Sequence, residues 1–187
     1  LCCDPALVYE NYEGGSAKLD LCIELIQSAV ESGHKILLFS QFTSMIEILT
    51  ARLQEESISC FVLQGSTKKE QRAQMVEQFN RDDTSVFCIS LKAGGTGLNL
   101  TGADIVIHYD PWWNVAVENQ ATDRAHRIGQ KNVVTVYKLI AKGTIEEKII
   151  KLQRMKEELA EEILSGDEIK TASFQREELL ELLEERF

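Results

Sequence analysis

The chain has 187 residues, of which 44% are hydrophobic, and its formal net charge is −10. The hydrophobic fraction is sufficient for a buried core and argues against global disorder, and no apolar run approaches the roughly 18 residues of a membrane-spanning helix. The negative charge excludes a uniformly basic surface, but residues 144–187 carry most of it, with 13 acidic and seven basic side chains. A local basic strip elsewhere could still contact phosphates.

The five cysteines are an odd number and include no C-x-x-C pair, which argues against a disulfide framework or a zinc site. Cys60 and Cys88 lie in apolar runs, so we expect them in the core. We therefore predict a reducing compartment, either the cytoplasm, in association with the nucleoid, or the nucleus. The first residues, from Leu1 to Pro5, resemble the interior of a longer protein, and we expect the chain to be a fragment.

The first third of the chain predicts a connector followed by alternating helices and strands. Residues 1–16 show no periodicity, and Ser16 is expected to cap a helix over residues 17–32, whose apolar positions follow helical spacing. The uniformly apolar run 36–40 predicts a strand buried on both faces, and a helix should follow over residues 45–54.

The rest of the chain continues the same alternation. Further strands are expected at 60–63, 86–90, 105–108 and 133–139, and further helices at 68–80, 115–126, 144–164 and 174–183. Ser66 or Thr67 is expected to cap the helix 68–80. Residues 165–167 should end the long helix 144–164. Buried strands that alternate with helices predict an α/β fold with a mostly parallel sheet.

Four polar segments directly follow predicted strands. These segments are Gln41, Gln64 to Thr67, Lys92 to Asn99 and Asp110 to Asn114. Because the carboxyl ends of parallel strands form the ligand-binding edge of such a sheet, we expect these segments to meet at one edge.

The loop from Lys92 to Gly97 has three glycines in four positions. Glycine lets backbone amides approach a phosphate closely, although a tight turn without a ligand would have the same composition. The loop does not match G-x-G-x-x-G, and the chain has no GK dipeptide, so it contains no P-loop.

A polar face is predicted on the helix 115–126. Gln120, Arg124 and Arg127 are spaced i, i+4 and i+7, which would place them on one ridge, where two guanidinium groups could reach adjacent oxygens of a polyphosphate. The alternative is a solvated helix face on which Asp123 pairs with Arg127.

The aromatic and histidine side chains nearby allow less specific conclusions. His34, His108 and His126 lack a nucleophile or metal partner in the sequence, so a structural role is favoured for each. Trp112 and Trp113 lie in a turn, where either core packing or stacking on a base or a partner domain is possible.

In combination, these segments resemble the second RecA-like lobe of Snf2-family ATPases, in helicase superfamily 2. The similarity covers roughly residues 1–164 in matching order. ILLFSQF (36–42) resembles motif IV, LQGST (63–67) with Arg72 the following block, SLKAGGTGLNL (90–100) motif V, PWWN (111–114) the segment behind it, and QATDRAHRIGQ (120–130) motif VI.

The resemblance implies a three-layer RecA-like α/β domain with a C-terminal helical extension. Residues 1–16 would be a connector and 17–143 the lobe. Residues 144–164 would form a brace-type helix that packs back across the first lobe, and 165–187 an acidic helical tail.

The resemblance also implies a function, since the family couples ATP hydrolysis to tracking along double-stranded DNA. This lobe would supply arginine fingers, nucleotide contacts and DNA-backbone contacts. The fingers would be Arg124 and Arg127, the nucleotide contacts Gly97, Asn99 and Gln120, and the DNA contacts Gln41, Ser66, Ser90, Lys92 and Thr96.

The N-terminal RecA-like lobe of the same protein would supply the P-loop and the acids that bind Mg²⁺. We therefore expect ATP and Mg²⁺ to act only in the complete enzyme, no metal ligands in this chain, no membrane contact, and no catalysis by the isolated lobe. The alternative function is a RecA-like protein-interaction domain without catalysis, against which the two arginines and the GGTG loop argue. A Rossmann-type oxidoreductase is disfavoured by the missing fingerprint.

Overall fold

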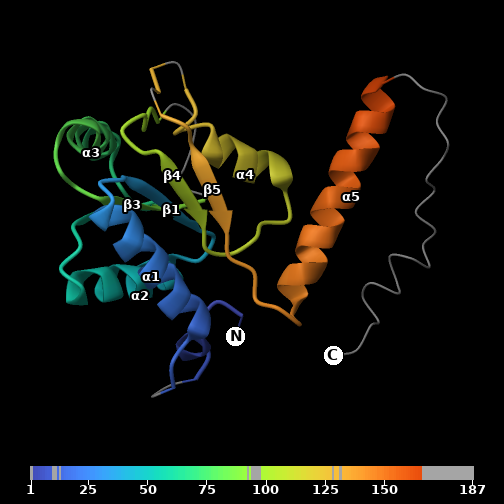
Figure 1. Ribbon diagram of the computed structural model, residues 1–187, viewed down its shortest axis with the longest axis horizontal. Coiled ribbons are helices and arrows are strands. Elements are labelled where there is room, and N and C mark those ends of the chain that lie inside the picture. Colours follow the sequence, from blue (N-terminus) through green and yellow to red (C-terminus); the bar gives the residue numbers. More distant parts are fainter. Residues whose placement is uncertain are drawn as a thin grey trace.

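The computed structural model describes residues 2–9, 12, 14–91, 93, 98–127, 129–130 and 132–165, with side chains as far as residue 158. Helices and strands alternate along the chain (Figure 1). Their order is η1 (Pro5–Leu7), α1 (Ala17–Glu31), β1 (Ile36–Ser40), α2 (Thr43–Glu55), β2 (Cys60–Leu63), α3 (Lys69–Arg81), β3 (Val86–Ser90), β4 (Ile105–His108), α4 (Val115–Thr122), β5 (Thr135–Lys138) and α5 (Ile145–Ser165).

The five described strands form one parallel sheet in the order β2-β3-β1-β4-β5. Alternate side chains of its central strands enter two separate cores. Leu38 and Cys88 pack against residues of α1 and α2, whereas Phe39 and Phe87 pack against Phe79 of α3 and against the α4 region. The predicted three-layer α/β fold is confirmed, and every strand pair in the described sheet is parallel.

The apolar runs predicted β1 to β4 with the bounds that the structure has. The strand expected at 133–139 is shorter, and β5 covers only Thr135–Lys138, all four residues of which are exposed. As an edge strand, β5 pairs with β4 alone, and the four residues of β4 limit the length of the ladder. Cys88 is fully buried as predicted, but Cys60, on the other edge strand, is only partly buried.

Of the two predicted helix caps, the one at the start of α1 is confirmed and the one at the start of α3 is wrong. Ser16 caps α1 as expected, because its Oγ accepts a hydrogen bond from the Leu19 amide at 3.4 Å. The predicted cap of α3 is wrong, because the residue before the helix is Lys68 and it makes no side-chain cap. Thr67 Oγ1 instead accepts from the Gln64 amide at 3.1 Å and closes the preceding turn.

The helix expected at 115–126 ends at Thr122, four residues early. Beyond it, backbone carbonyls are bonded to other segments: the Leu100 amide donates to the Arg124 carbonyl at 3.0 Å, and Gln130 Nε2 donates to the Ala125 carbonyl at 3.2 Å. After Thr122 the chain tightens, because the amides of Arg124 and Ala125 donate to carbonyls three residues back, those of Ala121 at 3.3 Å and Thr122 at 3.0 Å. Arg124 and Arg127 therefore lie in turns after α4, and the predicted ridge with Gln120 does not continue to them.

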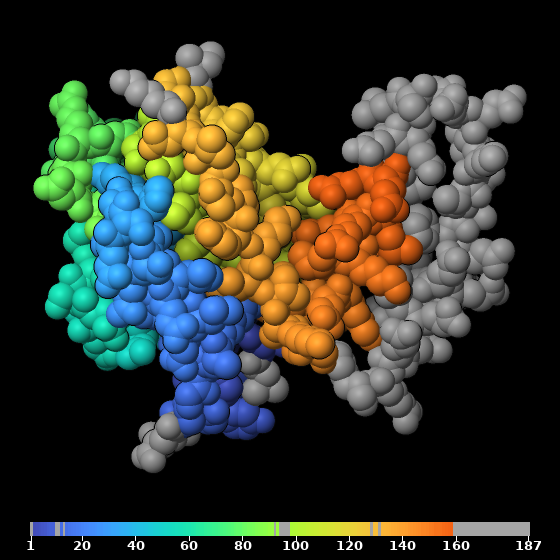
Figure 2. Space-filling view, viewed as in Figure 1, coloured from blue at the N-terminus to red at the C-terminus, as the bar shows by residue number. Residues whose placement is uncertain are grey.

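The segments at both ends of the lobe are attached to it. Cys3, in the predicted connector, is buried in the core beside α1 and α2, and its carbonyl accepts from Tyr109 Oη at 2.7 Å. The first turns of α5 lie against the lobe (Figure 2), where Lys18 Nζ contacts Glu146 at 2.7 Å and Gln153 Nε2 donates to Glu118 Oε1 at 3.1 Å. The tail predicted beyond Ser165 lies outside the described residues. No described helix has the length and apolar content that crossing a bilayer requires.

Candidate functional site

The carboxyl ends of β1 and β4 mark the point where the chain changes direction across the sheet. From β1 the chain passes through α2 to β2 on one side, and from β4 it passes through α4 to β5 on the other. In parallel α/β sheets this switch point is where ligands bind. Residues that follow these two strands meet there, as expected from the sequence.

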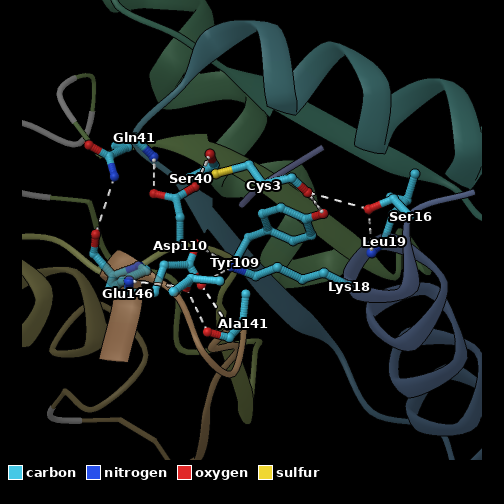
Figure 3. A network of polar contacts seen from close by, with 12 residues as sticks. Cys3, Ser16, Lys18, Leu19, Ser40, Gln41, Tyr109, Asp110, Ala141 and Glu146 are labelled. Atoms are coloured by element: carbon cyan, nitrogen blue, oxygen red, sulfur yellow. Dashed lines mark hydrogen bonds and ion pairs between the residues drawn. The ribbon is translucent and has the colours of Figure 1, made fainter. Parts of the chain in front are cut away.

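Asp110 connects the two strand ends at the switch point (Figure 3). Its buried carboxylate accepts from Ser40 Oγ at 2.5 Å and from the Gln41 amide at 3.0 Å. Burial raises the pKa of Asp110, although both hydrogen bonds oppose that shift. The Gln41 side chain donates to the Pro111 carbonyl at 3.2 Å, so in this structure it is bonded within the lobe.

Arg124 is the most unusual charged group near this edge. Its side chain is only 4% exposed, and its guanidinium lies 6.0 Å from the ring centre of Phe39. Nε and Nη1 have no hydrogen-bond partner among the described residues. Burial, and then the nearby charge of Arg127, lower the pKa of Arg124 to about 10, so the group stays charged at neutral pH.

The surface pair between Asp123 and Arg127, which was the alternative interpretation of this face, is not formed within the described part of the chain. Arg127 is exposed and close enough to Arg124 to affect its pKa. The two arginines therefore lie near each other, and neither forms an ion pair with an acid of the described residues. Such a pair is suited to an anion supplied from outside the lobe.

The remaining nucleotide-side candidates are placed only in part. Gln120, on α4, and Asn99 are both exposed, and the bond from the Leu100 amide to the Arg124 carbonyl brings the residue after Asn99 beside Arg124. Gly97 lies outside the described residues. The structure therefore brings the end of the glycine-rich segment together with the two arginines, although they are far apart in the sequence.

The candidates for DNA contact lie after three neighbouring strands. Ser66, in the turn after β2, is exposed, whereas Ser90, at the end of β3, is 3% exposed and its Oγ accepts from the Ala93 amide at 3.2 Å. Lys92 and Thr96 lie outside the described residues.

Two amide side chains that the sequence reasoning did not identify hold this region in place. Gln130 Nε2 donates to the carbonyls of Ala103 at 2.7 Å and of Ala125 at 3.2 Å. Asn80 donates to the Asn99 carbonyl at 2.8 Å and accepts from the Gly102 amide at 2.9 Å. Their partners are all backbone groups, so no pattern of side chains in the sequence could have indicated them.

His108 is buried and not positioned for proton transfer. Its ring stacks on Phe39, with centroids 5.4 Å apart, and its Nε2 lies 3.1 Å from Thr122 Oγ1. Burial lowers the pKa of His108 to about 4, although the Glu118 carboxylate raises it somewhat. The neutral ring agrees with the structural role favoured from the sequence.

The two tryptophans have different environments. Trp112 packs partly against the core on the α3 and α4 side, and its amide donates to Glu118 Oε1 at 2.6 Å. Trp113 is 47% exposed and lines a groove of about 480 Å³, shared with residues of the N-terminal segment, of α2 and of the first turn of α5. Core packing therefore accounts for Trp112 but not for Trp113.

A comparison with known protein families identifies the family of this chain. The model of the helicase conserved C-terminal domain matches residues 17–129, which include the segments after β1, β2, β3 and β4. The chain belongs to this family. Its further relatives place it in the Snf2 group of helicase superfamily 2, as its C-terminal RecA-like lobe.

Several curated proteins resemble this Snf2-type lobe. An uncharacterized ATP-dependent helicase of Mycoplasma pneumoniae is 47% identical over 90% of the chain, and the human chromatin-remodeling ATPase INO80 is 43% identical over 90%. The putative ATP-dependent helicase/translocase YwqA of Bacillus subtilis is 44% identical over 89%. The chain spans only 16%, 11% and 19% of the lengths of these proteins, respectively.

Solved structures show the same fold. The C-terminal part of the Fun30 ATPase domain aligns with a TM-score of 0.72 and 37% identity, over 78% of this chain and 48% of that one. The SWI2/SNF2 ATPase core of Sulfolobus solfataricus, solved in complex with double-stranded DNA, aligns with a TM-score of 0.73 and 34% identity, over 97% of this chain and 39% of that one. The expectation of a RecA-like lobe of the Snf2 group is confirmed.

Proposed function

We propose that this lobe is the second half of an ATP-dependent translocase or remodeller of double-stranded DNA. The family of the chain, the ATP-dependent relatives and the DNA complex of the archaeal neighbour support the proposal. ATP would bind between this lobe and an N-terminal RecA-like lobe of the same protein, which would hold Mg²⁺ and the triphosphate. By itself, the lobe would lack half of the catalytic site.

The observation that carries the proposal is the buried guanidinium of Arg124, next to Arg127, whose Nε and Nη1 have no hydrogen-bond partner in the part of the chain that the structure describes. A buried charge without partners is unfavourable, and it persists where a ligand completes the site. A γ-phosphate fits this requirement, because planar guanidinium donors match its oxygens. Arg124 and Arg127 would then act as arginine fingers, which neutralise the charge that develops during phosphoryl transfer.

We assign the neighbouring nucleotide contacts to Gly97, Asn99 and Gln120, of which the last two are exposed. Asn99 precedes Leu100, whose amide bonds to the Arg124 carbonyl, and Gln120 lies in α4 just before that turn, so both could contact the nucleotide while Arg124 and Arg127 contact the γ-phosphate.

The DNA backbone would be contacted by residues after β1, β2 and β3. They are Gln41, Ser66, Ser90, Lys92 and Thr96. Hydroxyl, amide and ammonium donors suit phosphate contacts that do not depend on base sequence. Ser66 is exposed for such a contact, whereas Ser90 is buried and would act by anchoring the loop that carries Lys92.

The test is Arg127→Ala in the full-length protein. We expect DNA-stimulated ATP turnover to fall by about 10³-fold or more while ATP affinity falls much less, because a finger acts mainly in the transition state. Arg52→Ala is the matched control, since this partly exposed arginine of α2 pairs with Glu55 and Asp20, away from the proposed site. Lost ATP binding with intact turnover would contradict the finger role, as would substantial ATPase activity of the isolated lobe.

One observation favours the alternative of a protein-interaction domain. The groove beside Trp113 is bordered by further exposed apolar side chains, those of Phe42 and Ile145. If binding of a protein partner were the function, Trp113→Ala would abolish activity in cells, and Arg127→Ala would leave that activity unchanged.

A further inference from the structure

Arg72, near the start of α3, makes an unusual set of contacts. Its guanidinium donates to four backbone carbonyls and to no side chain among the described residues. The distances are 2.8 Å from Nε to Thr67, 3.0 Å from Nη1 to Ala93, and 3.3 Å and 3.0 Å from Nη2 to Gln64 and Gly65.

These carbonyls belong to two different loops. Gln64, Gly65 and Thr67 form the turn after β2, and Ala93 lies in the loop after β3, the neighbouring strand. Arg72 thus holds together two loops that leave the same edge of the sheet. Thr67 Oγ1 closes the first loop, and the Ala93 amide is bonded to the carbonyl and hydroxyl of Ser90 in the second.

Only arginine can make this connection. Its five donors lie in one rigid plane, so they can reach carbonyls in several directions at once, whereas the ammonium of lysine is a single point with three donors. Arg72 also has no ion pair within the described part of the chain, so its positive charge stays at this edge. Its partners are main-chain atoms, so the arrangement depends on the fold and not on which side chains the two loops carry.

We propose that Arg72 is a positioning residue that fixes the turn 64–67 against the backbone at Ala93, after β3, as a surface for the DNA backbone. This inference rests on the proposed function, in which Ser66, in the turn held by Arg72, contacts a phosphate. A turn already held in place loses less conformational entropy when it contacts a phosphate. Without Arg72, the DNA would have to order this turn on binding.

The test uses Arg72→Lys and Arg72→Ala in the full-length protein, with Arg81→Ala as control. Arg81 lies on the same helix, is exposed and pairs with Glu77, so its removal changes the charge equally without affecting the contacts of Arg72. We expect both Arg72 variants to bind duplex DNA about tenfold more weakly, with unchanged affinity for ATP, and the control to bind within about twofold of wild type. Amide hydrogen exchange in residues 64–67 and 91–93 should accelerate in Arg72→Lys even without DNA.

The outcomes separate positioning from other roles. If Arg72→Lys bound DNA like wild type and only Arg72→Ala were weakened, Arg72 would act through its charge alone and the inference would be wrong. If Arg72→Lys also proved unstable, the effect of Ser66→Ala would decide: it should weaken DNA binding in wild type and have little further effect beside Arg72→Lys, whereas additive losses would overturn the inference. A wild-type protein that bound no duplex would overturn the proposed function, and the inference with it.

Discussion

Two buried cations of this lobe have opposite surroundings. Lys18 and Glu146 are 8% and 3% exposed, and Lys18 Nζ lies 2.7 Å from both carboxylate oxygens. The same carboxylate accepts from the Ala141 amide at 2.7 Å, and Lys18 lies 5.1 Å from the ring centre of Tyr109 (Figure 3). Arg124 is equally buried, yet two of its nitrogens have no partner among the described residues.

The presence or absence of partners suggests different roles for Lys18 and Arg124. Lys18 and Glu146 satisfy each other and join α1 to the first turn of α5, which is what a structural ion pair does. Nε and Nη1 of Arg124 have no such partner among the described residues, and this is why we propose that an anion from outside the lobe completes its site. Burial alone does not separate the two cases, whereas the presence of partners does.

The largest effect should come from Arg124→Met, which keeps a long apolar side chain beside Phe39 and removes the charge. We expect ATP turnover of the full-length protein to fall by about 10³-fold, while thermal stability stays the same or rises, because an uncompensated buried charge is removed. Turnover assays and thermal unfolding of the same preparation measure both. A clear loss of stability would mean that Arg124 is structural, and that the contrast with Lys18 is wrong.

For Glu146→Leu we expect a clear loss of stability, in contrast to Arg124→Met. It leaves Lys18 buried without its carboxylate, which should lower the free energy of unfolding by roughly 3–5 kcal/mol. Adding Lys18→Met should restore most of that loss, because an apolar pair of similar size can replace a buried ion pair. Urea unfolding of the single and double variants measures the change. A double variant as unstable as Glu146→Leu alone would show that the pair is not the cause.

A smaller effect on stability should come from the titration of His108. This buried, neutral side chain stacks on Phe39, the ring that Arg124 also lies near. Its pKa of about 4 in the folded state lies below the ordinary 6.5. Between these values the unfolded chain binds a proton that the folded chain does not, so stability should fall as the pH falls from about 7 to about 4, by up to roughly 3 kcal/mol. His108→Gln should flatten this part of the profile.

Urea unfolding at a series of pH values, compared between wild type and His108→Gln, tests the assignment. Other groups contribute equally to both proteins, including Asp110, whose raised pKa acts in the opposite direction. Parallel profiles would show that another group causes the slope.

The sequence predicted the fold better than the local geometry of the site. Uniformly apolar runs gave the bounds of β1, β3 and β4, because strands buried on both faces leave no polar position inside the element. The end of α4 was predicted wrongly: the amides of Arg124 and Ala125 bond to carbonyls three residues back, and the Arg124 carbonyl accepts from the amide of the distant Leu100. Helical spacing could not reveal contacts with segments distant in sequence.

The sequence by itself therefore determined the order of elements, the parallel α/β class and the motifs that identify the Snf2 group, since all of these depend on local periodicity and on residue types in order. The tertiary structure alone decided that Arg124 is buried without a described partner, that Lys18 meets Glu146, and that Arg72 joins two loops. The physical reason is that each of these features depends on atoms from separate segments, and several of the partners are backbone carbonyls, which every residue carries and no sequence pattern distinguishes.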